Sequence, residues 1–388
     1  MNTSPFSLLP AAKPDPIFSI LAEAIACGKE GINCTAGVLT DEDGQVSLLP
    51  SVAKAIADIS RKLTIQRFGY PPLLGLATYQ ASVHRLLFGE MHPWHVSSIA
   101  TTGGTGALAV NLRLMKSLLK SGRLLLPTPA WANHEPPALA ANLEVVSVPY
   151  LEDGIASVTA LLEQIRNENG DFGILLQVGC HNPTGLDLTD DQWGELLDVL
   201  KGKNCVVLLD SAYQGLKDKP EKDREPIDRF LQAGIPILIT WSAAKNHSIY
   251  ALRTGLACAV LPSADLIASI DGHYSRITRQ IHSASATIGQ MVVARTQEAY
   301  QEEWRADLRT ARASVAHKRS LMQESLPELF RSSLKGFGMF ALLPLSVDQI
   351  RRLKNEHKVF MTEDGRINIA GIPNARIKEF CEKVGRVL

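Results

Sequence analysis

The sequence predicts an α/β fold in which a mostly parallel, mixed sheet is flanked by helices and a smaller α+β domain is added. Two observations predict this class. Short runs rich in Leu, Ile and Val alternate with longer segments of helical period through the middle of the chain, which is typical of crossover connections and parallel strands. From about residue 300 the alternation stops, and a long charged helical stretch is followed by short strand-like pieces.

The elements of the larger part can be placed in chain order. Residues up to about Pro14 are rich in proline and serine and indicate an arm, and residues 15–25 indicate a helix. A helix is expected over 107–120, and another after Thr189, because Thr189 and Gln192 have the spacing of a capping box. Buried strands are expected at the apolar runs 123–126, 173–178, 205–210, 235–241 and 256–261.

The C-terminal part begins with a charged helix over 302–324 and ends in a helix from Ala375, with strand-like pieces at 339–343 and 366–369 between them. We expect the N-terminal segment to complete this unit. The predicted division is an arm over residues 1–13, a small domain formed by 14–46 and 313–388, and a large domain over 47–312.

Composition excludes several classes of protein. The 388 residues carry 40 basic and 40 acidic side chains and are 45% hydrophobic, so the chain is too apolar for intrinsic disorder and lacks the basic excess of a nucleic-acid-binding protein. The six cysteines form no Cys-x-x-Cys pair, the N-terminus has no secretory pattern, and no apolar run approaches the ~20 residues of a membrane span. We expect a reduced, cytoplasmic protein without a membrane or nucleic-acid partner.

A glycine-rich turn at residues 101–108 lies between a strand-like run and a helical run, where free backbone N–H groups can bind an anion. Residues Gly104 to Ala109 also fit the pattern G-x-G-x-x-A of dinucleotide-binding proteins. That interpretation needs an acidic residue ~20 positions further on, and none occurs between Val110 and His134. A nucleoside-triphosphate loop is excluded because Gly-Lys-Ser/Thr is absent. A plain glycine turn before a helix remains open.

Three further motifs follow predicted strands, where ligand sites of α/β sheets lie. They are His-Asn-Pro-Thr-Gly at 181–185, an Asp-x-x-Tyr pair formed by Asp210 and Tyr213, and Ser-x-x-Lys-Asn ending in Lys245-Asn246. Taken singly, each has a plainer explanation as a turn, a helix cap or a surface lysine. A lysine just beyond a buried strand is partly desolvated, however, which lowers its pKa and allows it to act as a nucleophile.

In chain order, the glycine-rich turn, Trp131-Ala-Asn-His134, these three motifs and Arg253-Thr-Gly resemble the class I aminotransferases of pyridoxal-phosphate fold type I, and most closely their aspartate/aromatic subgroup. The resemblance runs from about Asp15 to the C-terminus. It implies pyridoxal 5′-phosphate as cofactor and a homodimer with shared active sites. It also implies ping-pong transfer of the amino group of aspartate or an aromatic amino acid to 2-oxoglutarate.

The resemblance assigns roles to single residues. Lys245 is expected to form the internal aldimine and to move the proton between the substrate and the cofactor. Asp210 is expected to pair with the pyridine nitrogen, with His134 hydrogen-bonded behind it. Asn182 and Tyr213 are expected to hydrogen-bond the phenolic oxygen, and Trp131 to stack on the ring. The phosphate is expected to be bound by Gly104, Thr105, Ser242 and Arg253, with Tyr70 reaching it from the neighbouring subunit.

Two arginines are expected to bind substrate. Arg366 matches the family residue that binds the α-carboxylate, and Arg279 lies where the subgroup binds a side-chain carboxylate across the dimer. Gly37, with Trp131 and Asn182, is expected to line the substrate side. Two planar guanidinium groups suit a dicarboxylic substrate. For Arg279, a solvated charge on a helix surface remains the alternative.

The chain departs from the family pattern at Leu39, Gly69 and Ala284. Fewer polar groups are therefore expected around a small acidic side chain of the substrate. A more apolar pocket admits Phe, Tyr or Trp, because apolar pockets discriminate only weakly. The sequence therefore predicts aspartate or aromatic donors without ranking them.

Three other functions share parts of this pattern. A β-lyase or decarboxylase would keep the lysine and the aspartate, so the motifs leave it open as the alternative. A regulator built on such a domain would need an added DNA-binding module, for which no length is spare. A metal enzyme is disfavoured because His92 and His95 form a lone pair without supporting ligands.

Overall fold

The computed structural model describes residues 7, 16–41, 43–63, 69–90 and 93–388. The expected N-terminal arm, apart from Ser7, lies outside the described residues. The strands are β1 (Ile32–Asn33), β2 (His95–Thr102), β3 (Arg123–Thr128), β4 (Glu144–Pro149), β5 (Leu151–Glu152), β6 (Ile155–Ala156), β7 (Phe172–Gln177), β8 (Cys205–Ser211), β9 (Ile237–Ser242), β10 (Thr254–Leu261), β11 (Phe340–Leu342), β12 (Val359–Phe360) and β13 (Arg366–Asn368).

The α-helices range from four to 25 residues in length. They are α1 (Pro16–Ala26), α2 (Pro50–Leu63), α3 (Ala77–Phe88), α4 (Gly103–Leu118), α5 (Glu135–Ala140), α6 (Thr159–Asn167), α7 (Asp190–Leu200), α8 (Pro220–Asp223), α9 (Glu225–Gln232), α10 (Ala243–Asn246), α11 (Ile267–Ile281), α12 (Ile288–Ala299), α13 (Gln301–Ser325), α14 (Arg331–Leu334), α15 (Val347–His357) and α16 (Ile377–Gly385).

Within the described residues the main sheet has seven strands in the order β2-β10-β9-β8-β7-β3-β4. The strands from β9 to β4 pair in parallel, whereas β10 is antiparallel to both β9 and β2. The prediction of a mostly parallel, mixed sheet is confirmed. The antiparallel strand follows from the link between β9 and β10, which holds only the short helix α10 and a 3₁₀ turn and cannot cross back over the sheet.

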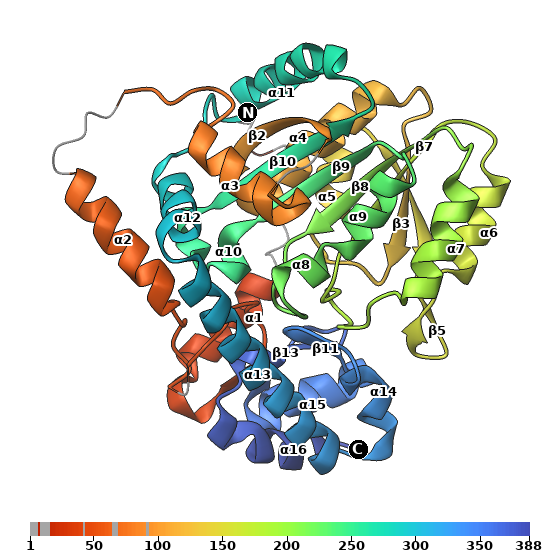
Figure 1. Cartoon of the computed structure of the whole chain (residues 1–388). Coiled ribbons are helices and arrows are strands. Elements are labelled where there is room, and N and C mark those ends of the chain that lie inside the picture. Colours follow the sequence, from red (N-terminus) through yellow and green to blue (C-terminus); the bar gives the residue numbers. More distant parts are fainter. Residues whose placement is uncertain (1–6, 8–15, 42, 64–68, 91–92) are drawn as a thin grey trace, which may run out of the picture.

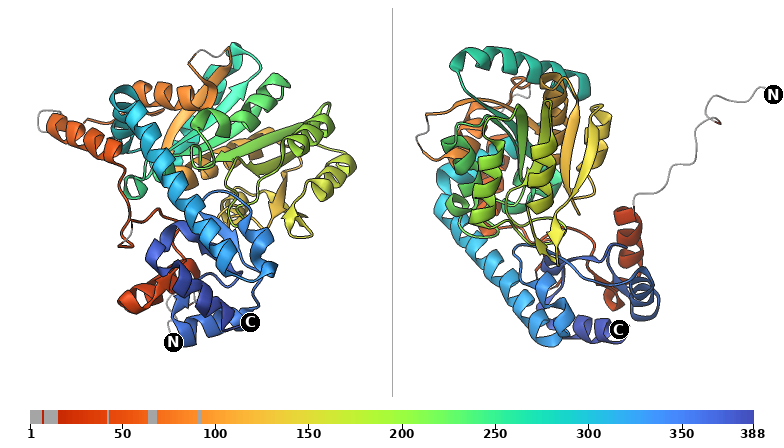
Figure 2. Two further views of the ribbon diagram at one scale, coloured as in Figure 1. Left: turned by 60° about the horizontal axis from the view of Figure 1, so that its bottom comes forward. Right: turned by 90° about the vertical axis from the view of Figure 1, so that its right-hand side faces the viewer.

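Helices cover both faces of this sheet (Figures 1 and 2). Successive side chains of β8 point to opposite faces of the sheet and so belong to two different apolar clusters. Leu208 lies in the cluster that includes α4, α5 and α11. Val207 and Leu209 lie in the cluster that includes α2, α3, α6, α7, α9 and α12. Because every side of the central strands is buried, they carry continuous apolar runs, which is why the sequence revealed them.

The C-terminal part has a core of its own, below the sheet in Figure 1. Strand β11 pairs with β13, and the N-terminal strand β1 pairs in parallel with β12. Ile32 and Cys34 pack in the same apolar cluster as residues of α13 to α16. The long helix α13 links the two parts, because Trp304 and Leu308 near its start belong to the core of the sheet and Met322 belongs to the C-terminal core.

Most predicted elements lie close to their expected bounds. The capping box is present, with the Thr189 hydroxyl accepting from the Gln192 backbone and the Gln192 side chain accepting from Thr189. Helix α4 begins at Gly103 rather than at Ala107, because the glycine-rich segment itself forms its first turn. The last helix begins at Ile377, since residues 374–376 form a 3₁₀ turn.

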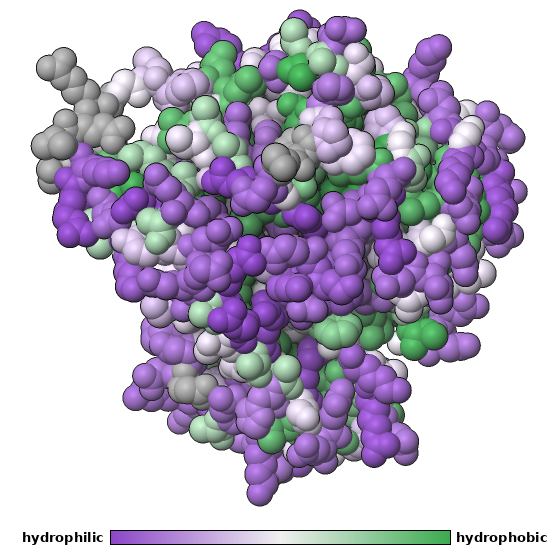
Figure 3. Space-filling model, viewed as in Figure 1, coloured by the Kyte–Doolittle hydropathy of each residue, from purple (hydrophilic) through white to green (hydrophobic). Residues whose placement is uncertain are grey.

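The face seen in Figure 3 is predominantly hydrophilic, with smaller apolar areas between the charged side chains. Among the described residues, no helix has both the length and the apolar character needed to cross a membrane. Helix α2 projects from the body of the chain (Figures 1 and 2).

Candidate active site

A pocket of about 620 Å³ lies where the carboxyl ends of the parallel strands meet the C-terminal part. Asn182 follows β7, Asp210 lies near the end of β8 and Ser242 ends β9, so neighbouring strands bring these side chains to one edge of the sheet. The residues of the predicted site that line the pocket are Gly37, Gly104, Thr105, Trp131, Asn182, Asp210, Tyr213, Ser242, Lys245, Arg253 and Arg366.

Lys245 lies in the short helix α10 that follows β9. Its ammonium nitrogen is 4.9 Å from the centre of the Tyr250 ring. Burial lowers the pKa of Lys245 to about 8, and the positive charges of Arg253 and Arg366 act in the same direction, while Asp210 opposes them. A substantial fraction of this amine is therefore neutral near physiological pH, which is the form that attacks a carbonyl carbon.

Asp210 is 5% exposed, and the Nε2–H of His134 donates to its carboxylate at 2.8 Å. The second ring nitrogen of His134, Nδ1, is buried and has no hydrogen-bond partner. A carboxylate fixed in this way at the floor of a pocket can accept one further hydrogen bond from a protonated ring nitrogen. His134 itself lies behind Asp210 and does not line the large pocket.

A chain of polar contacts crosses the pocket from Tyr213 to Arg366. The Asn182 Nδ2 donates to the Tyr213 hydroxyl at 3.2 Å, and Arg366 Nη1 donates to Asn182 Oδ1 at 3.5 Å. Burial raises the pKa of Tyr213 well above its ordinary value, so its hydroxyl stays protonated. A guanidinium has five N–H groups, and the structure shows two of them bonded, to Asn182 and to the Thr35 carbonyl, so Arg366 keeps donors for an incoming carboxylate.

The first turn of α4 forms a cradle for an anion. Gly103 has a φ of +71°, and a Cβ on it would lie 2.8 Å from Nη2 of Arg253, so only glycine fits this approach. A Cβ on Gly104 would lie 3.1 Å from the Cβ of Ser242. Because the Ser242 hydroxyl accepts from the Ala244 backbone, its proton is free to donate into the pocket. Helix N-terminus, hydroxyl and guanidinium together suit a phosphate dianion.

Besides His134, which lies behind Asp210, two residues of the predicted site do not reach the pocket of their own chain. Tyr70 is 98% exposed, and Arg279 is exposed near the end of α11. The three departures at Leu39, Gly69 and Ala284 also lie outside its lining. The apolar part of the lining includes Ile17, Phe18, Trp131 and Phe340.

Sequence reasoning missed Phe340 and Tyr250. The Phe340 ring lies 5.0 Å from the guanidinium carbon of Arg366 and meets the Tyr213 ring edge-on at 6.0 Å between centroids. A Cβ on Gly37 would lie 2.8 Å from this ring, so Phe340 also explains the glycine there. The only signal for Phe340 was its place in the strand-like piece 339–343, and Tyr250 was near Lys245 but in no recognised motif.

The donor set fits pyridoxal phosphate. Among the residues that the structure describes, no group of three or more His, Cys, Asp or Glu side chains could hold a metal ion, and His92 lies outside them. The pocket instead combines an anion cradle, a lysine with lowered pKa and a buried carboxylate. Those are the groups needed for a phosphate, an aldehyde and a pyridine nitrogen.

The chain is similar to known proteins over nearly its whole length. A family model described as aminotransferase class I and II matches residues 29–384. An aromatic-amino-acid aminotransferase of Escherichia coli is 30% identical over 99% of this chain and its own full length, and an aspartate aminotransferase of Pseudomonas aeruginosa is 31% identical over 99% of both chains. The solved aromatic-amino-acid aminotransferase of Burkholderia pseudomallei, covalently bound to pyridoxal phosphate, is 28% identical over the whole of both chains with a TM-score of 0.94.

Proposed function

The chain belongs to the class I and II aminotransferase family, and from this premise we propose that it moves the amino group of aspartate or an aromatic amino acid to 2-oxoglutarate with pyridoxal 5′-phosphate as cofactor. The observation that carries the proposal is the meeting of Lys245, Asp210 and the anion cradle of α4 in one pocket. When bound, the cofactor supplies an electron sink for the bond changes at the substrate Cα.

The residues that would hold the cofactor are divided by chemistry. The cradle formed by Gly104, Thr105, Ser242 and Arg253 would bind the phosphate. Asp210 would keep the pyridine nitrogen protonated, because an ionised carboxylate at hydrogen-bond distance favours the charged ring. Asn182 and Tyr213 would donate to the phenolic oxygen, Trp131 would cover one ring face, and Lys245 would attach covalently.

Lys245 would also carry the proton in the reaction. Its pKa of about 8 lets the amine accept a proton from the substrate Cα and return it at the neighbouring carbon without leaving the pocket. Arg253 and Arg366 disfavour the charged amine, and Asp210 limits that effect. This balance places the proton affinity of Lys245 in the range that general acid–base catalysis needs.

Arg366 would bind the substrate α-carboxylate through the N–H groups that its bonds to Asn182 and Thr35 leave available. A second carboxylate on the substrate would meet Arg279 of the partner subunit. The rings of Trp131 and Phe340 offer apolar surface to an aromatic side chain in the same pocket. One pocket with these two features would serve both donor classes.

The inferred homodimer is supported by an apolar groove beside the projecting helix α2. The groove has a volume of about 460 Å³, and its lining includes Val46, Leu48 and Ile288, which are between 41% and 54% exposed in the single chain. Exposed apolar surface of this kind marks a protein interface. Pairing of two chains would also give Tyr70 and Arg279, both exposed, a pocket to enter. We further propose a cytoplasmic location, supported by the absence of disulfides among the described cysteines.

The proposal is tested with the purified full-length chain. Wild-type protein is expected to take up pyridoxal phosphate, with visible absorbance that Lys245→Ala removes, and to convert 2-oxoglutarate to glutamate with aspartate, Tyr, Phe or Trp as donor. Lys201→Ala, which alters an exposed lysine outside the pocket, is the matched control and should match wild type. A colourless wild-type protein, or release of CO₂ or a β-substituent instead of glutamate formation, would contradict the proposal.

A further inference from the structure

We propose that Gln177 is a positioning residue for the amino-group transfer: its carboxamide holds the backbone of Asn182 and so orients the contacts of Asn182 with Tyr213 and Arg366. The inference rests on the proposed function, which it deepens by one residue. No motif of the sequence assigns Gln177 a role.

The Gln177 side chain makes a two-point clamp on one residue. Its Nε2 donates to the Asn182 carbonyl at 2.8 Å, and its Oε1 accepts from the Asn182 N–H at 3.0 Å. Gln177 ends β7, which is held between two other strands, and pairs in register with Asp210 on β8. The clamp therefore ties the turn after β7 to the rigid end of the sheet, directly beside the carboxylate of the site.

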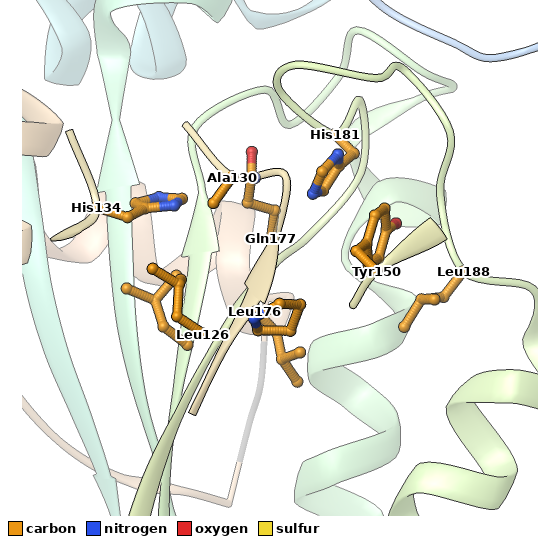
Figure 4. A pocket seen from close by; sticks show the side chains of 10 residues that line it. Leu126, Ala130, His134, Tyr150, Leu176, Gln177, His181 and Leu188 are labelled. Atoms are coloured by element: carbon orange, nitrogen blue, oxygen red, sulfur yellow. The ribbon is translucent and has the colours of Figure 1, made fainter. Parts of the chain in front are cut away.

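The location of Gln177 makes these two bonds hard to replace. Gln177 lines the large pocket and also a small cavity of about 10 Å³ that His134 and His181 line with it. Figure 4 shows its side chain between the two imidazole rings. Asn182 is 3% exposed, so without Gln177 its backbone N–H and carbonyl would lose these two bonds in the interior, and the turn would have to move to replace them.

Movement of Asn182 would alter its hydrogen bonds to both Tyr213 and Arg366, which lie at the two ends of the polar chain across the pocket. Because Asn182 Nδ2 donates to the Tyr213 hydroxyl, the proton of that hydroxyl points elsewhere and is available to a group in the pocket. The Oδ1 of the same amide accepts from Arg366, which also donates to the Thr35 carbonyl at 3.0 Å. Rotation or displacement of one amide would thus loosen a donor for the cofactor oxygen and the carboxylate-binding arginine together.

Two measurable effects follow. With weaker hydrogen-bond donors at the phenolic oxygen of the bound cofactor, this oxygen keeps more negative charge. The charge stabilises the proton beside it, so that proton is lost only at higher pH. The pH midpoint of the visible absorbance change is therefore expected to rise, by about one unit. With Arg366 less well oriented, KM for the amino donor is expected to rise more than kcat falls, with kcat/KM lower by ~10–100-fold.

The test uses Gln177→Met, which keeps the length of the side chain and removes both hydrogen bonds. The matched control is Gln192→Met. Gln192 also accepts from a backbone N–H, at 2.9 Å from Thr189, and donates to a backbone carbonyl, at 2.8 Å from Ala156, but it lies at the start of α7 outside the pocket. Both variants lose two bonds to backbone groups, so a general loss of stability affects both, whereas an effect on the site affects Gln177→Met alone.

A double-mutant cycle with Asn182→Ala isolates the route of the effect. If Gln177 acts through the Asn182 side chain, Gln177→Met should lower kcat/KM by less than ~3-fold in the Asn182→Ala background, against ~10–100-fold alone. Equal effects in both backgrounds would overturn the proposal. Should Gln177→Met not fold, Gln177→Glu, which keeps only the bond accepted from Asn182, is run through the same cycle and should give a smaller, non-additive effect.

Hydrogen exchange makes the result independent of the proposed function. The amide of Asn182 is expected to exchange at least ~10-fold faster in cofactor-free Gln177→Met than in wild type or Gln192→Met. Unchanged exchange refutes the clamp even if no donor is ever turned over. Faster exchange with an unmoved absorbance midpoint and unmoved KM in an active enzyme shows a structural bond without a positioning role. An inactive, colourless wild type instead refutes the function.

Discussion

Lys245 shares its pocket with the guanidinium groups of Arg253 and Arg366, and only the buried carboxylate of Asp210 compensates for them. An ordinary lysine has a pKa near 10.5, so fewer than about one amine in a thousand is neutral at pH 7. Burial and two neighbouring cations change that fraction far more than any contact made by the lysine itself. The reactivity of the residue is therefore a property of its surroundings.

This surrounding charge predicts a pH dependence. The rate at which cofactor-free protein attaches pyridoxal phosphate should rise with pH and level off above about 8, because attack requires the neutral amine of Lys245. Arg366→Gln removes one opposing charge, so its midpoint should lie above that of wild type. Stopped-flow absorbance across a pH series measures both. A midpoint near 10 in wild type, or the same midpoint in the two proteins, would contradict the argument.

At the residue scale, the motifs pointed to side chains whose chemistry is rare and whose spacing is fixed. Lys245, Asp210 and Arg366 could be named because their motifs follow one another in the order of the aminotransferase family, although each has a plainer explanation when taken singly. Phe340 and Gln177 could not be assigned in this way. An aromatic ring or an amide is common in cores and turns, and its use here depends on contacts with residues more than a hundred positions away or across a turn.

At the scale of elements, the contact of β10 with the start of α4 deserves a test. A Cβ on Gly255 would lie 2.5 Å from the carbonyl carbon and oxygen of Gly103, and neither is a flexible side chain that could move away. The two glycines thus let a strand and the anion cradle approach each other. The closeness of these backbones sets where the first turn of α4 points.

Gly255→Ala is expected to displace that turn. We expect a loss of stability of about 1–3 kcal/mol, typical of overpacking, and at least ~10-fold weaker binding of pyridoxal phosphate. Thermal unfolding and a cofactor titration measure the two effects. Gly194→Ala in α7, where an added Cβ would meet nothing within 4 Å, is the control and should instead stabilise by ~0.5–1 kcal/mol. Full cofactor affinity in Gly255→Ala would show that the cradle tolerates the shift.

Elements were predictable where one physical cause dominates. The central strands are buried on both faces, so their apolar runs stood out, and the capping box of α7 is a local pattern. The antiparallel direction of β10 was not evident, since it depends on the path of the link from β9 and not on the composition of the strand. The early start of α4 was missed because glycines usually indicate a turn.

At the scale of the whole molecule, the proposed dimer predicts complementation between inactive subunits. If Arg279 serves the pocket of the partner subunit, mixing Lys245→Ala with Arg279→Ala gives hybrids with one intact site. Statistical mixing then restores about a quarter of wild-type aspartate turnover, because half of the dimers are hybrids and each has one good site of two.

The measurement is turnover after unfolding and refolding the two variants together, with each variant refolded alone as the control. If Arg279 acts within its own chain, or only as a surface charge, the mixture will show no more activity than the mean of its parts. A groove variant, Ile288→Asp, refolded together with Lys245→Ala should restore no turnover. Ile288 lines the apolar groove where we place the interface, so its substitution should prevent hybrid dimers from forming.

The sequence placed Tyr70 and Arg279 at the pocket of a neighbouring subunit only through the family resemblance, because both side chains are exposed in the single chain. It could predict that the N-terminal segment joins the C-terminal part, since both lack the alternating pattern of the sheet. We propose that residues 14–46 and 313–388 form the small domain and 47–312 the large one. The pairing of β1 with β12 and the shared cluster of Ile32 and Cys34 support that division.

Helix α13 crosses the proposed boundary without a break, with Trp304 buried in one core and Met322 in the other. A helix gains stability from each added turn but is costly to nucleate, so half of it does not persist alone when the other half loses its core. Unfolding of either domain therefore removes packing contacts from α13, and the other domain depends on the same helix. The free energies of the two cores are in this way coupled, and we expect the chain to fold and unfold as one cooperative unit despite its two-part architecture.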